Sequence, residues 1–256
     1  MTRILWAILA LGLAANTAGA TDISGLKVEH ANRKNKAISV SAPHPVRSGD
    51  TALAFQVKDG QCKGNRSYND CKGSRERSEI VDRSKIRTGK EYWYAFSLFI
   101  PKSTPSIDPA TTILAQFQDT KGSGEITLGF NLFKEGLELS QDNPNTQQVD
   151  DMDPPKPMVI KIVTPPSRLR GRWIDLKVQA IWSVQQDGMI RVWVDGRKVH
   201  DHRGRNLNRN VAPSFKFGVY RSGLHKLRSI GRKVPTQLVY FDHIRRGTTE
   251  AEVSLK

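Results

Sequence analysis

The sequence predicts an all-β protein built as an antiparallel β-sandwich or jelly roll. Helical periodicity is nearly absent, and runs rich in Val, Ile, Phe, Tyr and Trp recur between Gly, Pro, Asn and Asp. Roughly ten or more short strands in one chain, without helical crossovers, are typical of that architecture. The expected strands cover residues 37–41, 51–57, 78–81, 91–100, 112–118, 126–133, 158–163, 173–182, 189–194, 215–220 and 237–244.

Residues 173–182 show the strand pattern most clearly. Apolar side chains at every second position from Ile174 to Trp182 alternate with Asp175 and Lys177. Because successive side chains of a strand point to opposite faces, this alternation indicates a sheet with one face in the core and the other in solvent.

The connections between strands indicate a single domain. The dipeptides at 187–188 and 195–196, both Asp-Gly, are turn signals that predict two hairpins. Residues 141–157 form a long, acidic, proline-rich segment, and long irregular loops in compact domains are often functional. We expect this loop to form one lip of a groove. With no internal repeat and no linker, residues 21–256 are expected to fold as one domain.

The N-terminal segment has the layout of a secretory signal peptide. Arg3 supplies a positive start, residues 4–15 are apolar, and the small residues at 18–20 form a cleavage site, so residues 1–20 are expected to be removed. The apolar run is shorter than the ~20 residues needed to span a bilayer. We therefore expect no membrane span, and export to the periplasm or the extracellular space.

The charge of the chain predicts an acidic partner. Forty Lys and Arg against 25 Asp and Glu give a formal net charge of +15, which attracts polyanions. For an exported protein, uronate or sulfated polysaccharides and anionic lipid surfaces are the relevant polyanions. Nucleic acid is not expected as a partner, because aromatic stacking residues are scarce in the polar strands described below.

Two cysteines, Cys62 and Cys71, lie nine residues apart in a polar stretch. In an oxidising compartment we expect them to form a disulfide that closes this loop. Two sulfurs with no histidine nearby make a poor metal site, so the pair is interpreted as a structural staple.

Three of the expected strands carry long polar side chains at every second position. If these strands share one sheet, their polar face forms an open groove suited to a sugar chain. Gly218, between two of these side chains, would leave room for a sugar ring against the backbone. The side chains on the polar face are Arg77, Glu79, Gln116, Gln118, Lys216 and Tyr220.

These strands resemble the signature strands of polysaccharide lyases with a jelly-roll, concanavalin-like fold. Residues 77–80, Arg-Ser-Glu-Ile, are similar to the Arg-x-Glu-Leu strand of alginate lyases. Residues 116–118, Gln-Phe-Gln, resemble their Gln-x-His strand, and residues 215–220, Phe-Lys-Phe-Gly-Val-Tyr, resemble their Tyr-Phe-Lys-x-Gly-x-Tyr strand. The segments at 45–49, 93–97 and 192–196 are closer to the heparin lyase and glucuronan lyase branch. The resemblance covers residues 40 to 245.

The resemblance implies a lyase that cleaves a uronate polysaccharide such as glucuronan, alginate or a heparin-like chain by β-elimination. Gln116, supported by Arg77, would bind the carboxylate of the reacting uronate and stabilise the enolate-like intermediate. Tyr220 would protonate the leaving oxygen. The expected substrate-binding side chains are Glu79, Gln118, Lys216 and Arg221, although the period of two places Arg221 on the core side.

The general base is left open by one departure from the family pattern. Where alginate lyases carry the histidine of Gln-x-His, this chain has Gln118, which cannot act as a base. Either Tyr220 performs both proton transfers, or His225 or His44 serves as the base. No cofactor is expected to be required. For a possible structural calcium ion, Asp242 is the one ligand that the sequence suggests.

Two other functions are alternatives to the lyase hypothesis. A non-catalytic module of the same shape would bind acidic glycans without cutting them. A hydrolase would need two carboxylates that flank the bond, whereas Glu76 and Glu79 are expected on opposite faces of a strand. The protein is expected to be a monomer.

Overall fold

The computed structural model describes residues 23–30, 35–64, 69–121, 124–144 and 159–254. The predicted signal peptide and most of the predicted proline-rich loop lie outside the described residues, so these two features stay predictions. None of the helices in the described ranges has the length and apolarity to cross a membrane.

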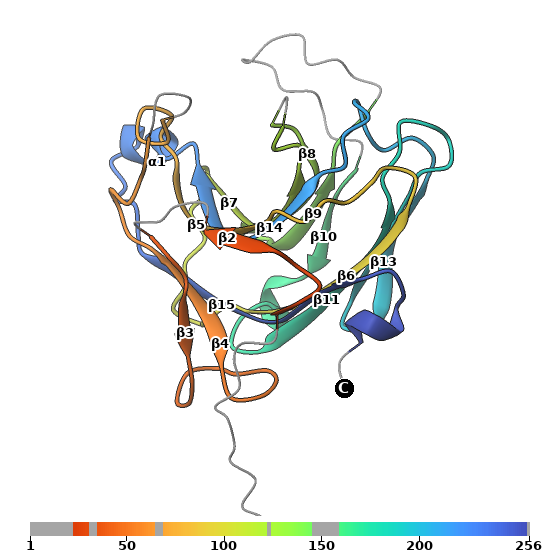
Figure 1. The fold of residues 1–256 in the computed structure, drawn as a ribbon. Coiled ribbons are helices and arrows are strands. Elements are labelled where there is room, and N and C mark those ends of the chain that lie inside the picture. Colours follow the sequence, from red (N-terminus) through yellow and green to blue (C-terminus); the bar gives the residue numbers. More distant parts are fainter. Residues whose placement is uncertain (1–22, 31–34, 65–68, 122–123, 145–158, 255–256) are drawn as a thin grey trace, which may run out of the picture.

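Two antiparallel sheets pack face to face in a β-sandwich, which confirms the predicted jelly-roll class (Figure 1). One sheet has the order β13 (Arg197–Arg203), β12 (Met189–Val194), β11 (Trp173–Ile181), β6 (Glu91–Phe99), β15 (Gln237–Gly247), β4 (Ala52–Val57) and β3 (Ile38–Val40), and the short β1 (Ile23–Ser24) pairs parallel with β15. The other has the order β10 (Val159–Thr164), β9 (Gly136–Gln141), β8 (Ile126–Phe133), β7 (Thr111–Gln118), β14 (Ser214–Ser222), β5 (Glu76–Asp82) and β2 (Val28–His30).

Helical structure in the described residues is confined to short pieces. These are α1 (His225–Ser229), directly after β14, and the 3₁₀ turns η1 (Pro166–Arg168) and η2 (Ala251–Val253). The helix α1 packs through Leu227 into a small apolar cluster beside the main core.

The main core fills the space between the two sheets. The apolar residues of β11 face inward as predicted, since Ile174, Leu176 and Val178 are buried. Phe117 and Phe215, from adjacent strands of the opposite sheet, stack with ring centroids 5.0 Å apart. Fully burying a side chain of this size stabilises the fold by roughly 1.5–3 kcal/mol, so these contacts hold the polar strands in a fixed position.

Every predicted strand is present, with small shifts at the ends, and two substantial strands were not predicted. β9 reads Gly-Leu-Glu-Leu-Ser-Gln and β13 reads Arg-Lys-Val-His-Asp-His-Arg, so each has few apolar residues. Both are held by tertiary pairing, which overrides weak local preference. The predicted hairpin between β12 and β13 is confirmed, because Asp195 and Gly196 both have positive φ, as its tight turn requires.

A β-bulge interrupts the pairing of β14 with β7, and it corrects two expectations. The register shifts between Phe217 and Tyr220, and it places Ile113 directly opposite Tyr220 rather than on the core-facing row. Gly218 has φ of +132°, and a Cβ there would lie 2.3 Å from the carbonyl oxygen of Ser78. Glycine is therefore required by the backbone and its close neighbours, and the expected space for a sugar ring is not its role.

Candidate active site

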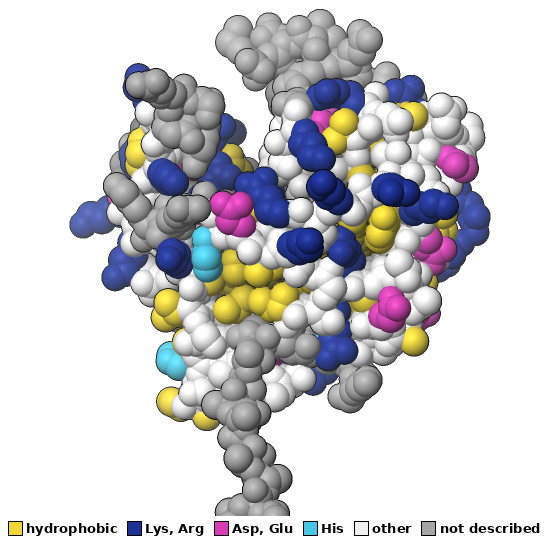
Figure 2. All heavy atoms as spheres, viewed as in Figure 1, with side chains coloured by type: hydrophobic (Ala, Val, Ile, Leu, Met, Phe, Trp, Pro, Cys, Tyr) yellow, Lys and Arg dark blue, Asp and Glu magenta, His cyan; other side chains and the backbone are white. Residues whose placement is uncertain are grey.

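The three polar strands lie side by side in one sheet, in the order β7, β14, β5, which meets the condition for a shared polar face. Lys216 pairs with Gln116 on one side, and Tyr220 pairs with Arg77 on the other. Residues directly opposite in an antiparallel pair point to the same face, so the side chains converge. Figure 2 shows the molecule hollowed between two lobes above this part of the fold, with basic side chains gathered at the base of the hollow, which we call the groove.

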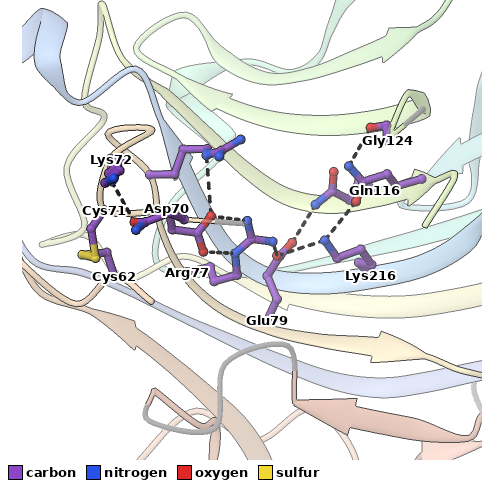
Figure 3. Close-up of polar contacts among 12 residues, drawn as sticks. Cys62, Asp70, Cys71, Lys72, Arg77, Glu79, Gln116, Gly124 and Lys216 are labelled. Carbon is purple, nitrogen blue, oxygen red and sulfur yellow. Dashed lines mark hydrogen bonds and ion pairs between the residues drawn. A yellow bond between two sulfur atoms is a disulfide. The ribbon is translucent and has the colours of Figure 1, made fainter. Parts of the chain in front are cut away.

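Glu79 is the centre of a polar cluster at the base of the groove, which consists of Arg77, Glu79, Gln116, Gln118 and Lys216 (Figure 3). Its side chain is 2% exposed, and its Oε1 accepts a hydrogen bond of 2.7 Å from Gln116 Nε2. Its Oε2 accepts a bond of 3.2 Å from an Arg77 terminal nitrogen and lies 3.3 Å from Lys216 Nζ. A buried carboxylate is costly unless it is paired and hydrogen-bonded. The Glu79 carboxylate is therefore bound by one donor from each of the three strands β5, β7 and β14.

Lys216 connects this carboxylate to the far side of the cluster. Its Nζ donates to Gln118 Oε1 at 3.0 Å, and Gln118 Nε2 donates to the Gly124 carbonyl at 2.7 Å. Burial lowers the pKa of Lys216, and Glu79 opposes that shift. Gln118 is thus held at the groove surface by partners on both ends of its amide.

Arg77 joins the cluster to Tyr220. Its guanidinium carbon lies 4.5 Å from the centroid of the Tyr220 ring, a cation–π arrangement. Burial raises the pKa of Tyr220 above the ordinary value for tyrosine, and the positive charges of Arg77 and Arg75 oppose this increase. Although burial disfavours the Arg77 cation, hydrogen bonding to Asp70 and the charge of Glu79 raise its pKa. Arg77 is therefore a permanent cation beside the phenol.

Asp70 also belongs to this network, although the sequence did not single it out. Its side chain is 1% exposed, and its two oxygens accept bonds of 2.8 and 2.7 Å from Nε and a terminal nitrogen of Arg77. The predicted disulfide between Cys62 and Cys71 is confirmed, and it lies next to this aspartate (Figure 3). The one sequence feature that could have indicated Asp70 is its position directly before a disulfide cysteine.

Gln116 occupies a deeper position than its expected role suggested. Its side chain is almost wholly buried, and its Nε2 is directed to Glu79. The carboxylate fixes the orientation of the amide, because the opposite orientation would bring two acceptors together. One proton of Nε2 is used in this way, and the second is the donor that remains.

The structure does not support a substrate contact at Arg221. This side chain is fully buried on the face of β14 opposite Tyr220, where it forms an ion pair with Glu76 and donates to the Pro235 carbonyl. The period of two explains the result, because Arg221 follows Tyr220 directly and points into the protein.

Neither histidine considered as a base belongs to the cluster. His44 Nδ1 lies 3.2 Å from the hydroxyl of Tyr240, on β15 in the opposite sheet. His225 is exposed at the start of α1, and it takes no part in the hydrogen bonds that connect the described residues of the cluster. Of the three residues considered as the general base, Tyr220 is the one in contact with a described side chain of the cluster, through the ring contact with Arg77.

Asp242 has a structural role in the part of the chain that the structure describes. Its carboxylate accepts backbone N–H bonds from Arg47 at 2.8 Å, Ser48 at 3.0 Å and His243 at 2.6 Å. These donors hold the turn before β4 against β15. No group of three or more metal-binding side chains occurs in the described ranges, so the calcium site stays a prediction without a ligand set.

The comparisons with known proteins agree with this architecture. An endo-β-1,4-glucuronan lyase from the fungus Trichoderma reesei superposes with a TM-score of 0.62 and 20% identity, covering 91% of this chain and 96% of that one. The family 7 alginate lyase AlgAT5 gives 0.50 at 13% identity, covering 77% and 76%. The catalytic domain of a glycoside hydrolase family 131 protein from Coprinopsis cinerea gives 0.52 at 10% identity, covering 80% and 73%.

The neighbours on their own show a shared fold, because their identities are low and one of them is a hydrolase. No curated protein matches the chain in a sequence search. The family model described as polysaccharide lyase, however, matches residues 18–245, which is most of the sequence. The motif strands and the cluster that they form lie within this match, and the chain therefore belongs to the polysaccharide lyase family.

Proposed function

We propose that the protein is an exported lyase that cleaves a uronate-containing polysaccharide by β-elimination in the groove. The observation that carries this proposal is the placement of Tyr220 against the Arg77 guanidinium, at the edge of a buried network built from β5, β7 and β14. The similarity to a glucuronan lyase and an alginate lyase supports a uronate as the sugar. The disulfide and the predicted signal peptide support export.

The first requirement of the reaction is to acidify the C5 proton of the uronate. The neighbouring carboxylate is negatively charged, so removal of this proton is difficult unless donors delocalise the developing charge. Pre-organised donors of this kind are commonly worth ~3 kcal/mol each. Arg77 has two N–H groups beyond those used by Asp70 and Glu79. These two groups make Arg77 the candidate donor to the substrate carboxylate, and the second N–H of Gln116 is a further donor, on the other side of Glu79.

The second requirement is a proton acceptor for C5 and a proton donor for the leaving oxygen at C4. We assign both to Tyr220. As phenolate it takes the C5 proton, the electrons of that bond form the C4=C5 double bond, and the C4–O bond breaks. The phenol then returns the proton to the leaving oxygen. The residue ends in its starting state, so the cycle needs no further reactant.

A single proton-transfer group restricts the stereochemistry of the substrate. One side chain reaches both atoms only when the C5 hydrogen and the C4 oxygen lie on the same face of the sugar ring. Glucuronate and mannuronate meet this condition, and guluronate and iduronate do not. We therefore propose a glucuronan-like or mannuronate-rich polymer as the substrate.

The proposal is tested by following the ultraviolet absorbance of the new C4=C5 double bond with four polymers: glucuronan, polymannuronate, polyguluronate and heparin. Absorbance should increase with glucuronan or polymannuronate and stay flat with polyguluronate. The Tyr220→Phe variant provides the matched control for trace contaminating lyase. Binding without any product on all four polymers would instead favour a glycan-binding module.

A further inference from the structure

Asp70 is the least exposed charged group that contacts Arg77. Both of its oxygens bind the guanidinium in a bidentate pair, at 2.8 and 2.7 Å. Planar fork-to-carboxylate pairing fixes the orientation of an arginine as well as its position. Asp70 therefore determines the plane in which the Arg77 guanidinium lies.

The backbone of Asp70 is fixed by its own loop. Its N–H donates to the Lys63 carbonyl at 2.8 Å, and its carbonyl accepts from the Arg75 N–H at 2.8 Å. Lys63 and Asp70 directly follow and precede Cys62 and Cys71, so the disulfide closes the loop at the residue pair that holds the aspartate. The covalent link, which Figure 3 shows, therefore acts on the same short stretch as these backbone hydrogen bonds.

Arg77 transmits this placement to the phenol. The guanidinium lies 4.5 Å from the Tyr220 ring centroid, and Arg77 and Tyr220 are direct partners across β5 and β14. A guanidinium stabilises a phenolate only when it stays near the ring, because the interaction of two charges falls with distance. The orientation of Arg77 therefore affects the proton affinity of Tyr220.

We propose that Asp70 is a positioning residue for Tyr220 that acts through Arg77, and that the Cys62–Cys71 disulfide holds Asp70 in the position this requires. The inference rests on the proposed role of Tyr220 as the proton-transfer group. Asp70 itself pairs with the edge of the guanidinium, is almost fully buried, and takes no part in the proposed proton transfer.

Positioning and simple charge predict opposite effects on Tyr220. The negative charge of Asp70, taken alone, raises the pKa of the phenol, so its removal would lower that pKa. Loss of the bidentate pair instead leaves Arg77 with its single bond to Glu79. The guanidinium can then turn away from the ring, which removes the positive charge that favours phenolate. Under the positioning role, Asp70→Asn therefore raises the pKa of Tyr220.

The experiment measures the tyrosine titrations directly in the full chain. The sequence contains five tyrosines, so tyrosine labelled with ¹³C at the ring carbon that carries the hydroxyl gives a small set of NMR signals, and Tyr220→Phe assigns the relevant one. Asp70→Asn should shift the Tyr220 titration to higher pH. On glucuronan, kcat should fall by about tenfold or more, with a smaller change in KM.

Two further variants isolate the cause. Asp59→Asn removes a carboxylate from the same region, whose pair with Arg228 is exposed, and it should leave the Tyr220 titration and kcat unchanged. Joint replacement of Cys62 and Cys71 by serine should shift both readouts in the same direction as Asp70→Asn. If Asp70→Asn does not fold, the double cysteine variant supplies the same measurements.

An unchanged or lowered Tyr220 pKa in folded Asp70→Asn would overturn the positioning role. Wild-type behaviour of the double cysteine variant would overturn the part assigned to the disulfide. The NMR titration needs no substrate. A wild-type protein that is inactive on every uronate polymer would therefore contradict the proposed function while leaving the Asp70 result readable.

Discussion

Arg77 and Tyr220 face each other across the β5–β14 pair, with the guanidinium carbon 4.5 Å from the ring centroid. Tyr220→Phe preserves this ring contact and removes only the hydroxyl. We expect turnover to fall to the background rate while the affinity for glucuronan stays within about twofold, because the hydroxyl carries the proton and the other contacts remain.

The measurement combines product absorbance with equilibrium binding to the polymer. Tyr240→Phe is the matched control, since Tyr240 lies in the other sheet beside His44. Unchanged turnover in Tyr220→Phe would remove Tyr220 from the mechanism.

Glu79 gives a prediction about stability. Glu79→Gln removes a buried charge and leaves the cations of Arg77 and Lys216 without their shared partner. We expect the free energy of unfolding to fall by about 3 kcal/mol, because breaking a buried ion pair leaves an uncompensated charge. Chemical denaturation measures this change.

The matched control is Glu29→Gln, whose pair with Arg83 is exposed. It should cost less than about 1 kcal/mol, as surface ion pairs usually do. Equal losses in the two glutamate variants would show that Glu79 is not the organising charge of the cluster.

The proton affinity of Tyr220 predicts the pH profile of catalysis. Burial raises its pKa, so near neutral pH the residue is almost entirely a phenol. Because phenolate is the proposed base, kcat should rise with pH by about tenfold per unit until the pKa is reached.

Arg77 opposes the effect of burial, so Arg77→Gln should move this rise to still higher pH. The profiles are recorded at saturating glucuronan. A flat kcat between about pH 6 and about pH 9 would point to a base other than tyrosine.

His200 predicts the acid sensitivity of the fold. Burial, with a contribution from Lys161, lowers its pKa to about 4, and its Nε2 lies 2.6 Å from Gln141 Oε1. The folded state therefore favours neutral histidine. The stability it contributes is complete above the unfolded value near 6.5 and is lost as the pH falls from there towards 4, by about 1–3 kcal/mol.

His200→Gln keeps a neutral hydrogen-bonding side chain and should flatten this part of the stability curve, measured by denaturation at several pH values. His225→Gln, at an exposed position on α1, serves as the control. An identical acid dependence in His200→Gln and wild type would contradict the assignment.

Side-chain alternation was sufficient to predict the face of the site. The period of two placed Glu79 beside Arg77, and Lys216 on the face of Tyr220, because it depends only on local strand geometry. The same rule identified Arg221 as core-facing, which its full burial confirms.

The remaining features depend on contacts between distant parts of the chain. The bulge at Gly218 arises where β14 passes Ser78 on β5, and no local pattern reports that crowding. Asp70 belongs to a loop whose composition indicates only a turn. Its pairing with Arg77 follows from the disulfide and the strand register together.

The strand order β7–β14–β5 has a consequence for when the enzyme becomes active during its biogenesis. β14 comes late in the chain and lies between β5 and β7, two strands from the first half. The side chains of β5 and β7 therefore form one site only after β14 has been inserted between these strands. Such distant pairing is formed slowly. A chain that lacks β14 therefore has no assembled groove, and catalytic activity requires that the sheet be complete.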